Sequence, residues 1–243
     1  MKDSTARYYE RTRDFRNSLV LVLPVMIFYQ IAIIPNANAI NGVDFIFRFF
    51  VYFFKNKPYA IWLYLAFTGF LVLLMIVLAW IFGRKNRFTW DYVPPLIAEC
   101  TLYAVVLGAA AVVITRWVVE AQPRVATAAH HEGPFTILVI SAGAGVYEEI
   151  VFRLAIFGGL VRLFRKGLKA TRPAAVLVGV IASAALFSLA HYMGREEMTL
   201  ANFTFRFVAG AIFCLLFEAR GFAAAVYTHT IYDIIVLFLS PGR

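Results

Sequence analysis

Three charged side chains, Glu148, Glu149 and Arg153, interrupt an otherwise apolar stretch of this 243-residue chain. A charge at the centre of a bilayer costs about 2.5–3.5 kcal/mol on insertion scales. Charged residues kept at that depth face the interior of a helix bundle or a water-filled cavity, and they usually mark function. This short stretch is therefore the first candidate for chemistry.

The spacing of these charges gives them different surroundings. On a helix, Glu149 and Arg153 are four residues apart, so they share one face and can form an ion pair. Glu148 is rotated by about 100° from Glu149 and can point elsewhere. Arginine could then neutralise one carboxylate while the other stays available for proton transfer. The alternative is a structural ion pair that only holds helices together.

Two histidines and an aspartate lie in two later apolar stretches. His191 is near the end of one stretch, four residues after Phe187, whereas His229 lies well inside the last stretch. Asp233 follows His229 by one helical turn, where a carboxylate can accept a hydrogen bond from the ring and fix its tautomer. Arg206 lies in the stretch between them, where it either reaches toward the outer interface or holds a substrate carboxylate.

These residue types suit two kinds of hydrolysis. A carboxylate can act as general base on water while a histidine stabilises the oxyanion. Alternatively, Glu148, His191 and His229 could bind a catalytic zinc that activates water. The His-Glu-x-x-His zinc motif is absent, and no serine is paired with these histidines by any motif. We expect that no cofactor is required, with zinc as the alternative.

The elements that position these residues follow from composition. Hydrophobic residues make up 62% of the chain and charged residues only 15%, and the mean hydropathy is +0.76. Soluble domains carry about 25% charged residues, so this chain has too little polar surface for a soluble globule. Both cysteines, Cys100 and Cys214, lie in apolar stretches and are expected to be buried rather than bridged.

Hydropathy predicts an all-α bundle of about seven transmembrane spans in one domain, residues 1–243. A span needs roughly 20 apolar residues. The seven candidates are about Leu19–Ile34, Ala60–Phe82, Pro94–Ile114, Phe135–Leu160, Ala174–Tyr192, Asn202–Phe217 and Phe222–Leu239. The aromatic stretch Phe45–Phe54 carries Arg48 and is expected to be an interfacial helix.

The net charge of +9 reflects where the basic residues lie. With the N-terminus inside, fourteen of the 23 Lys and Arg residues fall in inner segments, seven in outer segments and two within spans. This bias predicts a cytoplasmic N-terminus and an outer C-terminus, in what we expect to be the inner membrane of a bacterium. No basic face or stacking platform for nucleic acid is present.

Three ordered motifs resemble those of the CAAX protease and bacteriocin-processing (CPBP) family of membrane endopeptidases. Glu148-Glu149-Ile150-Val151-Phe152-Arg153 matches Glu-Glu-x-x-x-Arg. Phe187-Ser188-Leu189-Ala190-His191 matches Phe-x-x-x-His, and His229-Thr230-Ile231-Tyr232-Asp233 matches His-x-x-x-Asn or Asp. The resemblance covers residues 135–239, the expected catalytic region. The third motif ends in Asp233 where the eukaryotic CAAX endopeptidases have Asn, which argues against prenylated CAAX substrates.

The resemblance implies a site and a reaction. It implies an endopeptidase that hydrolyses a peptide bond of a membrane-associated protein or peptide. Glu148 would activate water, and His191 would orient the water or bind the oxyanion. His229 and Asp233 would complete the pocket, with Glu149 held by Arg153.

Two other functions are consistent with the sequence. The chain could be a non-catalytic membrane partner, such as an immunity or scaffold protein of the same fold. It could also be a proton-coupled transporter that uses Glu148, Glu149 and His229 as a relay. The absence of paired half-helices or repeat symmetry in the sequence argues against transport.

Overall fold

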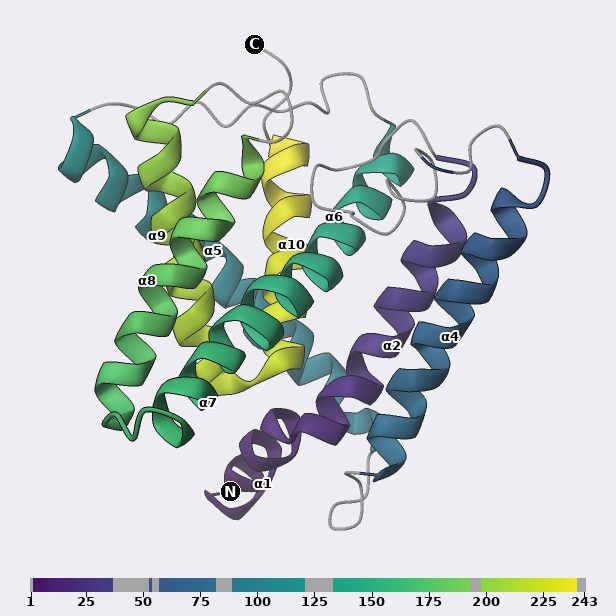
Figure 1. The fold of residues 1–243 in the computed structure, drawn as a ribbon, viewed down its shortest axis with the longest axis horizontal. Helices are drawn as coiled ribbons and strands as arrows, with labels where there is room; N and C mark the ends of the chain where they lie inside the picture. The colour runs from purple at the N-terminus through teal and green to yellow at the C-terminus, as the bar shows by residue number, and fades with distance from the viewer. Residues whose placement is uncertain are drawn as a thin grey trace.

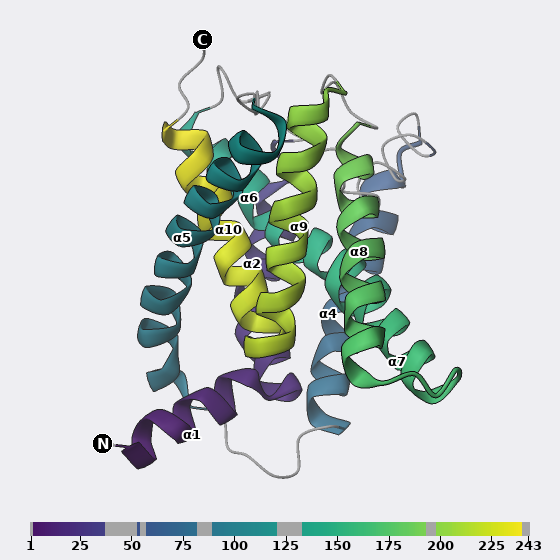
Figure 2. The same cartoon turned by 90° about the vertical axis from the view of Figure 1, so that its left-hand side faces the viewer.

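The computed structural model describes residues 2–36, 53, 57–81, 89–120, 133–192 and 198–239, and these residues form helices with no strand among them. The helices are α1 (Lys2–Arg13), α2 (Phe15–Ala32), α4 (Ala60–Ile81), η1 (Trp90–Tyr92), α5 (Val93–Val119), α6 (Pro134–Glu148), η2 (Glu149–Phe157), α7 (Gly158–Lys166), α8 (Arg172–His191), α9 (Leu200–Arg220) and α10 (Phe222–Leu239). Figures 1 and 2 show them as one bundle, with most axes running between the same two ends.

Seven of these helical segments are long and apolar enough to cross a membrane, which confirms the predicted all-α membrane bundle. The fourth span is the longest, because α6, η2 and α7 continue one another over residues 134–166. Its last turns carry three exposed basic side chains, so α7 extends past the apolar part: Arg162, Arg165 and Lys166. The interfacial helix expected near Phe45–Phe54 lies almost wholly outside the described residues.

The lipid-facing surface is provided mainly by α4 and α5. Large apolar side chains project from them, and Trp80 and Trp117 are 75% and 88% exposed. Such exposure would be unfavourable in water but is expected where lipid tails cover the protein. The integral membrane location predicted from composition therefore agrees with the surface of the folded chain.

Helix α10 lies at the centre of the bundle and contacts α2, α5, α6 and α9. Its first turns carry three consecutive buried alanines, Ala223–Ala225, which let neighbouring helices approach closely. On the facing helix α6, Gly145 is directly against Thr230 and the Val226 carbonyl of α10, so a side chain at position 145 would clash with both. This close contact fixes α6 and α10 at the depth where their polar residues meet.

The polar N-terminal segment forms a helix that the sequence patterns did not predict. Figures 1 and 2 show α1 at the end of the bundle, lying across it rather than along the spans. Asp14 separates it from α2 and caps α2 by accepting a hydrogen bond from the Asn17 N–H at 3.1 Å. The chain therefore enters its first span through a defined turn.

An ion pair attaches α1 to the bundle. Arg220, at the end of α9, donates to both carboxylate oxygens of Glu99 on α5, at 2.6 and 2.8 Å. The Tyr8 hydroxyl of α1 donates to the same carboxylate at 2.5 Å. Burial and this hydrogen bond raise the pKa of Tyr8 well above its ordinary value, so its phenol stays a neutral donor.

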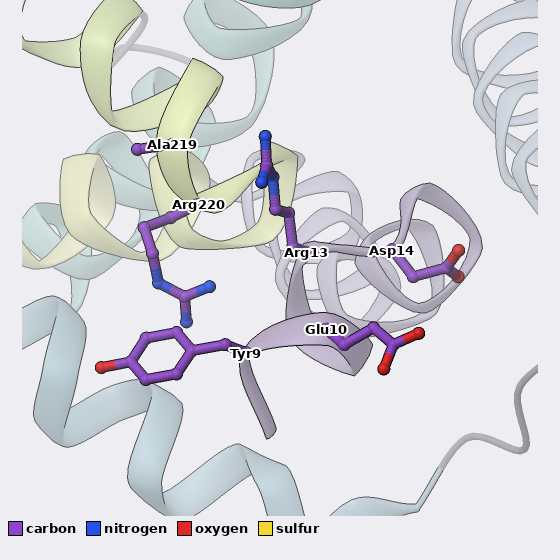
Figure 3. Close-up of a pocket in the computed structure, with 6 residues that line it drawn as sticks. All are labelled: Tyr9, Glu10, Arg13, Asp14, Ala219 and Arg220. Carbon is purple, nitrogen blue, oxygen red and sulfur yellow. The ribbon is translucent and has the colours of Figure 1, made fainter. Parts of the chain in front are cut away.

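A cavity of about 500 Å³ lies beside this ion pair. Its lining residues come from the α1–α2 turn and the end of α9: Tyr9, Glu10, Arg13, Asp14, Ala219 and Arg220. Figure 3 shows the Arg220 guanidinium close to the Tyr9 ring, and their separation is 4.2 Å from Cζ to the ring centroid. None of the residues predicted to do chemistry lines this cavity.

The arrangement of the ends predicts a topology that can be tested. The α7–α8 turn lies at the same end of the bundle as α1, whereas α10 ends at the opposite end (Figure 1). A reporter that is active only outside the cytoplasm should therefore be inactive when fused after Arg172 and active when fused after Leu239. Equal activity at both positions would contradict seven spans.

Candidate active site

The predicted site residues of two helices face one another across the centre of the bundle. Glu148 ends α6 and Glu149 begins η2, while His229 and Asp233 lie on α10. Helices α6 and α10 lie side by side (Figure 1). The Gly145 contact brings them close enough for carboxylates to reach the His229 ring, so the first and third motifs form one cluster.

Glu149 is the residue that joins this cluster. Its Oε1 atom lies 2.7 Å from Nδ1 of His229 and 3.2 Å from Nη1 of Arg153. Glu149 and Arg153 are fully buried, and His229 is only 3% exposed. The carboxylate can only accept when ionised, so Nδ1 of His229 carries the proton in this contact.

The hydrogen-bond partner of the His229 ring comes from another helix. The spacing allowed Asp233, one turn later on the same helix, to accept the hydrogen bond that fixes the tautomer. Asp233 instead lies 3.8 Å from Nε2, beyond hydrogen-bond length, and Glu149 on the other helix takes Nδ1. The reason is tertiary: the close packing of α6 on α10 places a carboxylate nearer to the ring than the local i, i+4 geometry does.

Glu148 is held more loosely than Glu149. Its Oε2 atom lies 3.6 Å from Nε2 of His229, too far for a hydrogen bond, and the side chain is 4% exposed. The two adjacent glutamates thus differ in the way their spacing suggested. Glu149 has two close partners, the Arg153 guanidinium and the His229 ring. Glu148 is not hydrogen-bonded to the ring, so its oxygens stay available to accept a proton.

Aromatic rings surround the buried arginine. The Arg153 guanidinium carbon lies 4.3 Å from the centroid of Phe187 on α8 and 5.0 Å from that of Phe213 on α9. A desolvated guanidinium over an aromatic face gains about 2 kcal/mol or more, which offsets part of its burial cost. Phe213 also stacks on His229 with centroids 4.6 Å apart, so one ring contacts both Arg153 and His229. Phe213 belongs to none of the three motifs, so no sequence pattern pointed to it.

A π-helix positions the first motif. Residues Glu149–Phe157 form η2, in which backbone hydrogen bonds span five residues instead of four. Such segments are rare and occur frequently at functional sites. The Phe152 carbonyl in η2 accepts a hydrogen bond from the Ser183 hydroxyl of α8 at 2.6 Å. No sequence pattern indicated this distortion, and its partner lies 31 residues away in the chain.

His191 lies at the edge of the site and shows a defined tautomer. Its Nδ1 is 2.8 Å from the Phe187 carbonyl, which can only accept, so Nδ1 carries the proton. In the neutral ring, Nε2 is then an acceptor. The Phe187 ring contacts both histidines, with centroids 4.7 Å from His191 and 6.1 Å from His229. Neutral His191 can orient a water, but it cannot donate a hydrogen bond to an oxyanion.

A catalytic zinc is held by about three convergent His, Cys, Asp or Glu side chains. Among the described residues, no group of three or more such side chains is close enough together to hold one. His191 and His229 both use Nδ1 in other contacts, which leaves Nε2 as the ring nitrogen that could face an ion or a water.

Comparison with known proteins gives one match. The family model for type II CAAX prenyl endopeptidase Rce1-like proteins matches residues 130–235. This segment contains all three motifs, and the match confirms the resemblance to the CPBP family. Neither the curated proteins nor the solved structures gave a significant match.

The hydrogen bond between Ser183 and the π-helix can be tested against a matched control on the same helix. The hydroxyl of Ser188 also donates to a backbone carbonyl, that of Phe203 on α9, at 2.9 Å. Each serine-to-alanine change should cost about 0.5–1.5 kcal/mol of stability. Ser183→Ala should also reduce activity per inserted molecule, because it frees the η2 carbonyl, whereas Ser188→Ala should not. Equal activity of the two variants would show that the contact does not position the site.

Proposed function

We propose that this chain is an intramembrane endopeptidase in which Glu148 activates water to hydrolyse a peptide bond of a membrane-associated protein or peptide. The observation that carries the proposal is the buried cluster in which Glu149 is held by Arg153 and His229 while Glu148 faces the same ring at 3.6 Å. In this arrangement the Glu149 carboxylate is fixed, whereas the Glu148 carboxylate is available to accept a proton from water. The family match supports peptide-bond hydrolysis as the reaction class.

The reaction follows from these positions. Glu148 accepts a proton from water as the water oxygen bonds to the scissile carbonyl carbon, and the carbonyl electron pair moves to oxygen. The protonated Glu148 then gives its proton to the amide nitrogen as the carbon–nitrogen bond breaks. A general base or acid placed in this way contributes about 10²–10⁴-fold to the rate.

The remaining residues orient and hold this machinery. His191 presents Nε2 as an acceptor for a proton of the attacking water, since its Nδ1 is bonded to Phe187. His229 is fixed by Glu149 and stands between Glu148 and Asp233. Arg153 pairs with Glu149 and is itself fixed between the rings of Phe187 and Phe213. We place the protein in a bacterial cytoplasmic membrane with its N-terminus inside, from the bias of basic residues.

Replacing each glutamate in turn by glutamine tests the roles assigned to Glu148 and Glu149. Glu148→Gln keeps the size of the side chain but removes the base, so turnover should fall by at least about 10²-fold while the protein still inserts and folds. Glu149→Gln weakens the contacts of buried Arg153 and His229, so it should lower the melting temperature as well as activity. The measurement is turnover per correctly inserted molecule, together with thermal stability.

Two results would contradict this assignment. Normal turnover in Glu148→Gln, with none in Glu149→Gln, would exchange the roles of the glutamates. Normal turnover in both would remove the hydrolytic mechanism and favour a non-catalytic membrane partner. In cells, Glu148→Gln should cause uncleaved membrane-anchored precursors to accumulate, and proteomics of these precursors would identify the substrate.

We also propose that the reaction needs no metal ion. A glutamate base requires only a positioned water and a donor for the oxyanion. The purified protein should therefore keep its turnover after stringent chelation. Loss of activity on chelation, with recovery on return of stoichiometric zinc, would overturn this prediction. Metal content measured by mass spectrometry on the same samples provides the control.

A further inference from the structure

Arg206 lies on the face of α9 that looks into the site, although it belongs to none of the three motifs. It precedes Gly210 by four residues and Phe213 by seven, and these spacings place all three on one face of the helix. At Gly210, the absence of a side chain leaves room for Phe187 and Ala184 of α8. Phe213 stacks on His229 of α10. This face of α9 therefore meets both helices that carry the histidines.

The register of α8 against α9 places Arg206 near His191. These helices run antiparallel, with the Ser188 hydroxyl bonded to the Phe203 carbonyl and Phe187 packed at Gly210. Moving one turn from Gly210 toward the start of α9 gives Arg206. The same displacement on α8 moves from Phe187 to His191, so the two side chains lie at the same level of the bundle.

The register of α10 against α9 gives the same position. Phe213 is level with His229, and the two helices also run antiparallel. Asp233 lies one turn after His229 on α10. Because the helices are antiparallel, this displacement runs toward the start of α9, where Arg206 lies. These two registers place Arg206 level with His191 and within one turn of Asp233, where its positive charge raises the electrostatic potential at both groups. Arg206 is thus at the edge of the carboxylate cluster, where three helices meet.

Among the described motif residues, none presents a suitable donor to an oxyanion. Glu148 and Asp233 are acceptors when ionised, and because Nδ1 of His229 carries the proton donated to Glu149, Nε2 of the neutral ring is an acceptor. Nε2 of neutral His191 is an acceptor. Arg153 is fully buried between phenylalanine rings and paired with Glu149. Hydrolysis nevertheless places a negative charge on the carbonyl oxygen, and its stabilisation is usually the largest catalytic contribution.

We propose that Arg206 is a catalytic residue that binds the carbonyl oxygen of the scissile bond and stabilises the oxyanion formed when water attacks. A guanidinium has five N–H donors in a rigid fork, so it can keep existing contacts and still bind this oxygen. No proton leaves Arg206 during the reaction: its N–H groups donate hydrogen bonds as the carbonyl electron pair moves to oxygen. This inference rests on the proposed endopeptidase function.

The test compares the full-length protein with Arg206→Ala and Arg206→Lys. The probe is a set of lipid-anchored, internally quenched peptides that the native protein cleaves and Glu148→Gln does not, each made with a free and with an amidated C-terminus. Arg206→Ala should lower kcat by about 10²–10³-fold, as loss of an oxyanion donor does, with little change in KM. Arg206→Lys keeps the charge and should lose less. Millimolar guanidinium should restore part of the turnover of Arg206→Ala.

Arg172→Ala is the matched control. Arg172 lies at the opposite end of α8 and forms an exposed ion pair with Glu218, so its removal should leave both kcat and its response to guanidinium unchanged. Insertion and melting temperature are measured for every variant. If Arg206→Ala does not fold, the kcat of Arg206→Lys and of Arg206→Met decides the question.

Three results would overturn the proposal. Unchanged kcat in Arg206→Ala would show that the side chain does not act on the reaction. A rise in KM confined to peptides with a free C-terminus would show that Arg206 binds a substrate carboxylate instead. Equal losses in Arg206→Lys and Arg206→Ala without guanidinium rescue would indicate a packing role. Failure of the endopeptidase function itself is distinguishable, because Glu148→Gln would then match the native protein on these peptides.

Discussion

The contact of Glu149 with both Arg153 and His229 is the interaction on which the site depends. It places a carboxylate between a guanidinium and an imidazole where none of the three groups can reach bulk water. Removing one member of a buried charged pair typically costs about 3–5 kcal/mol, because the partner stays buried without its counter-charge. The three residues are therefore only stable as a set, and the set requires α6, η2 and α10 to keep their relative positions.

The helix packing around this set follows from small side chains and aromatic rings. Gly145 lets α6 approach α10, while Gly210 lets α9 approach α8 at Phe187. Phe187 and Phe213 then enclose Arg153 from two further helices. In a membrane there is little hydrophobic drive for helices to associate, so close packing and polar contacts must hold the bundle together. The same contacts that stabilise this bundle therefore also arrange its polar residues.

The N-terminal helices, which lie outside the matched segment, are attached at two places to the helices that follow. The side chain of Gln30 on α2 bonds the hydroxyls of both Tyr64 on α4 and Tyr147 on α6, directly beside Glu148. At the end of the bundle where α1 lies, Glu99 and Arg220 join α5 to α9, and Tyr8 adds α1. The Glu99 carboxylate and the Gln30 amide each bond to at least two partners, so they specify how the N-terminal helices dock. Through these contacts the first half of the chain, which carries none of the three motifs, supports the structure of the site.

The sequence by itself determined the fold class, the seven apolar helices found among the described residues and most of the residues that gather at the site. Hydropathy is a sum over neighbouring residues, so each span could be located without knowing the others. The cost of a charge in lipid is likewise a local property, and it singled out Glu148, Glu149 and Arg153 before any contact was known. The His229 and Asp233 positions followed from the same reasoning.

Only the tertiary structure decided how these residues are connected. That Glu149 rather than Asp233 bonds the His229 ring depends on the rotation and depth at which α6 packs against α10. The π-helix bonds to Ser183 of another helix, and α1 bonds to Arg220, more than 200 residues away in the chain. The level of Arg206 relative to His191 and Asp233 follows from the register of three antiparallel helices. Such distances are set by side-chain packing between helices, which no local pattern in the sequence records.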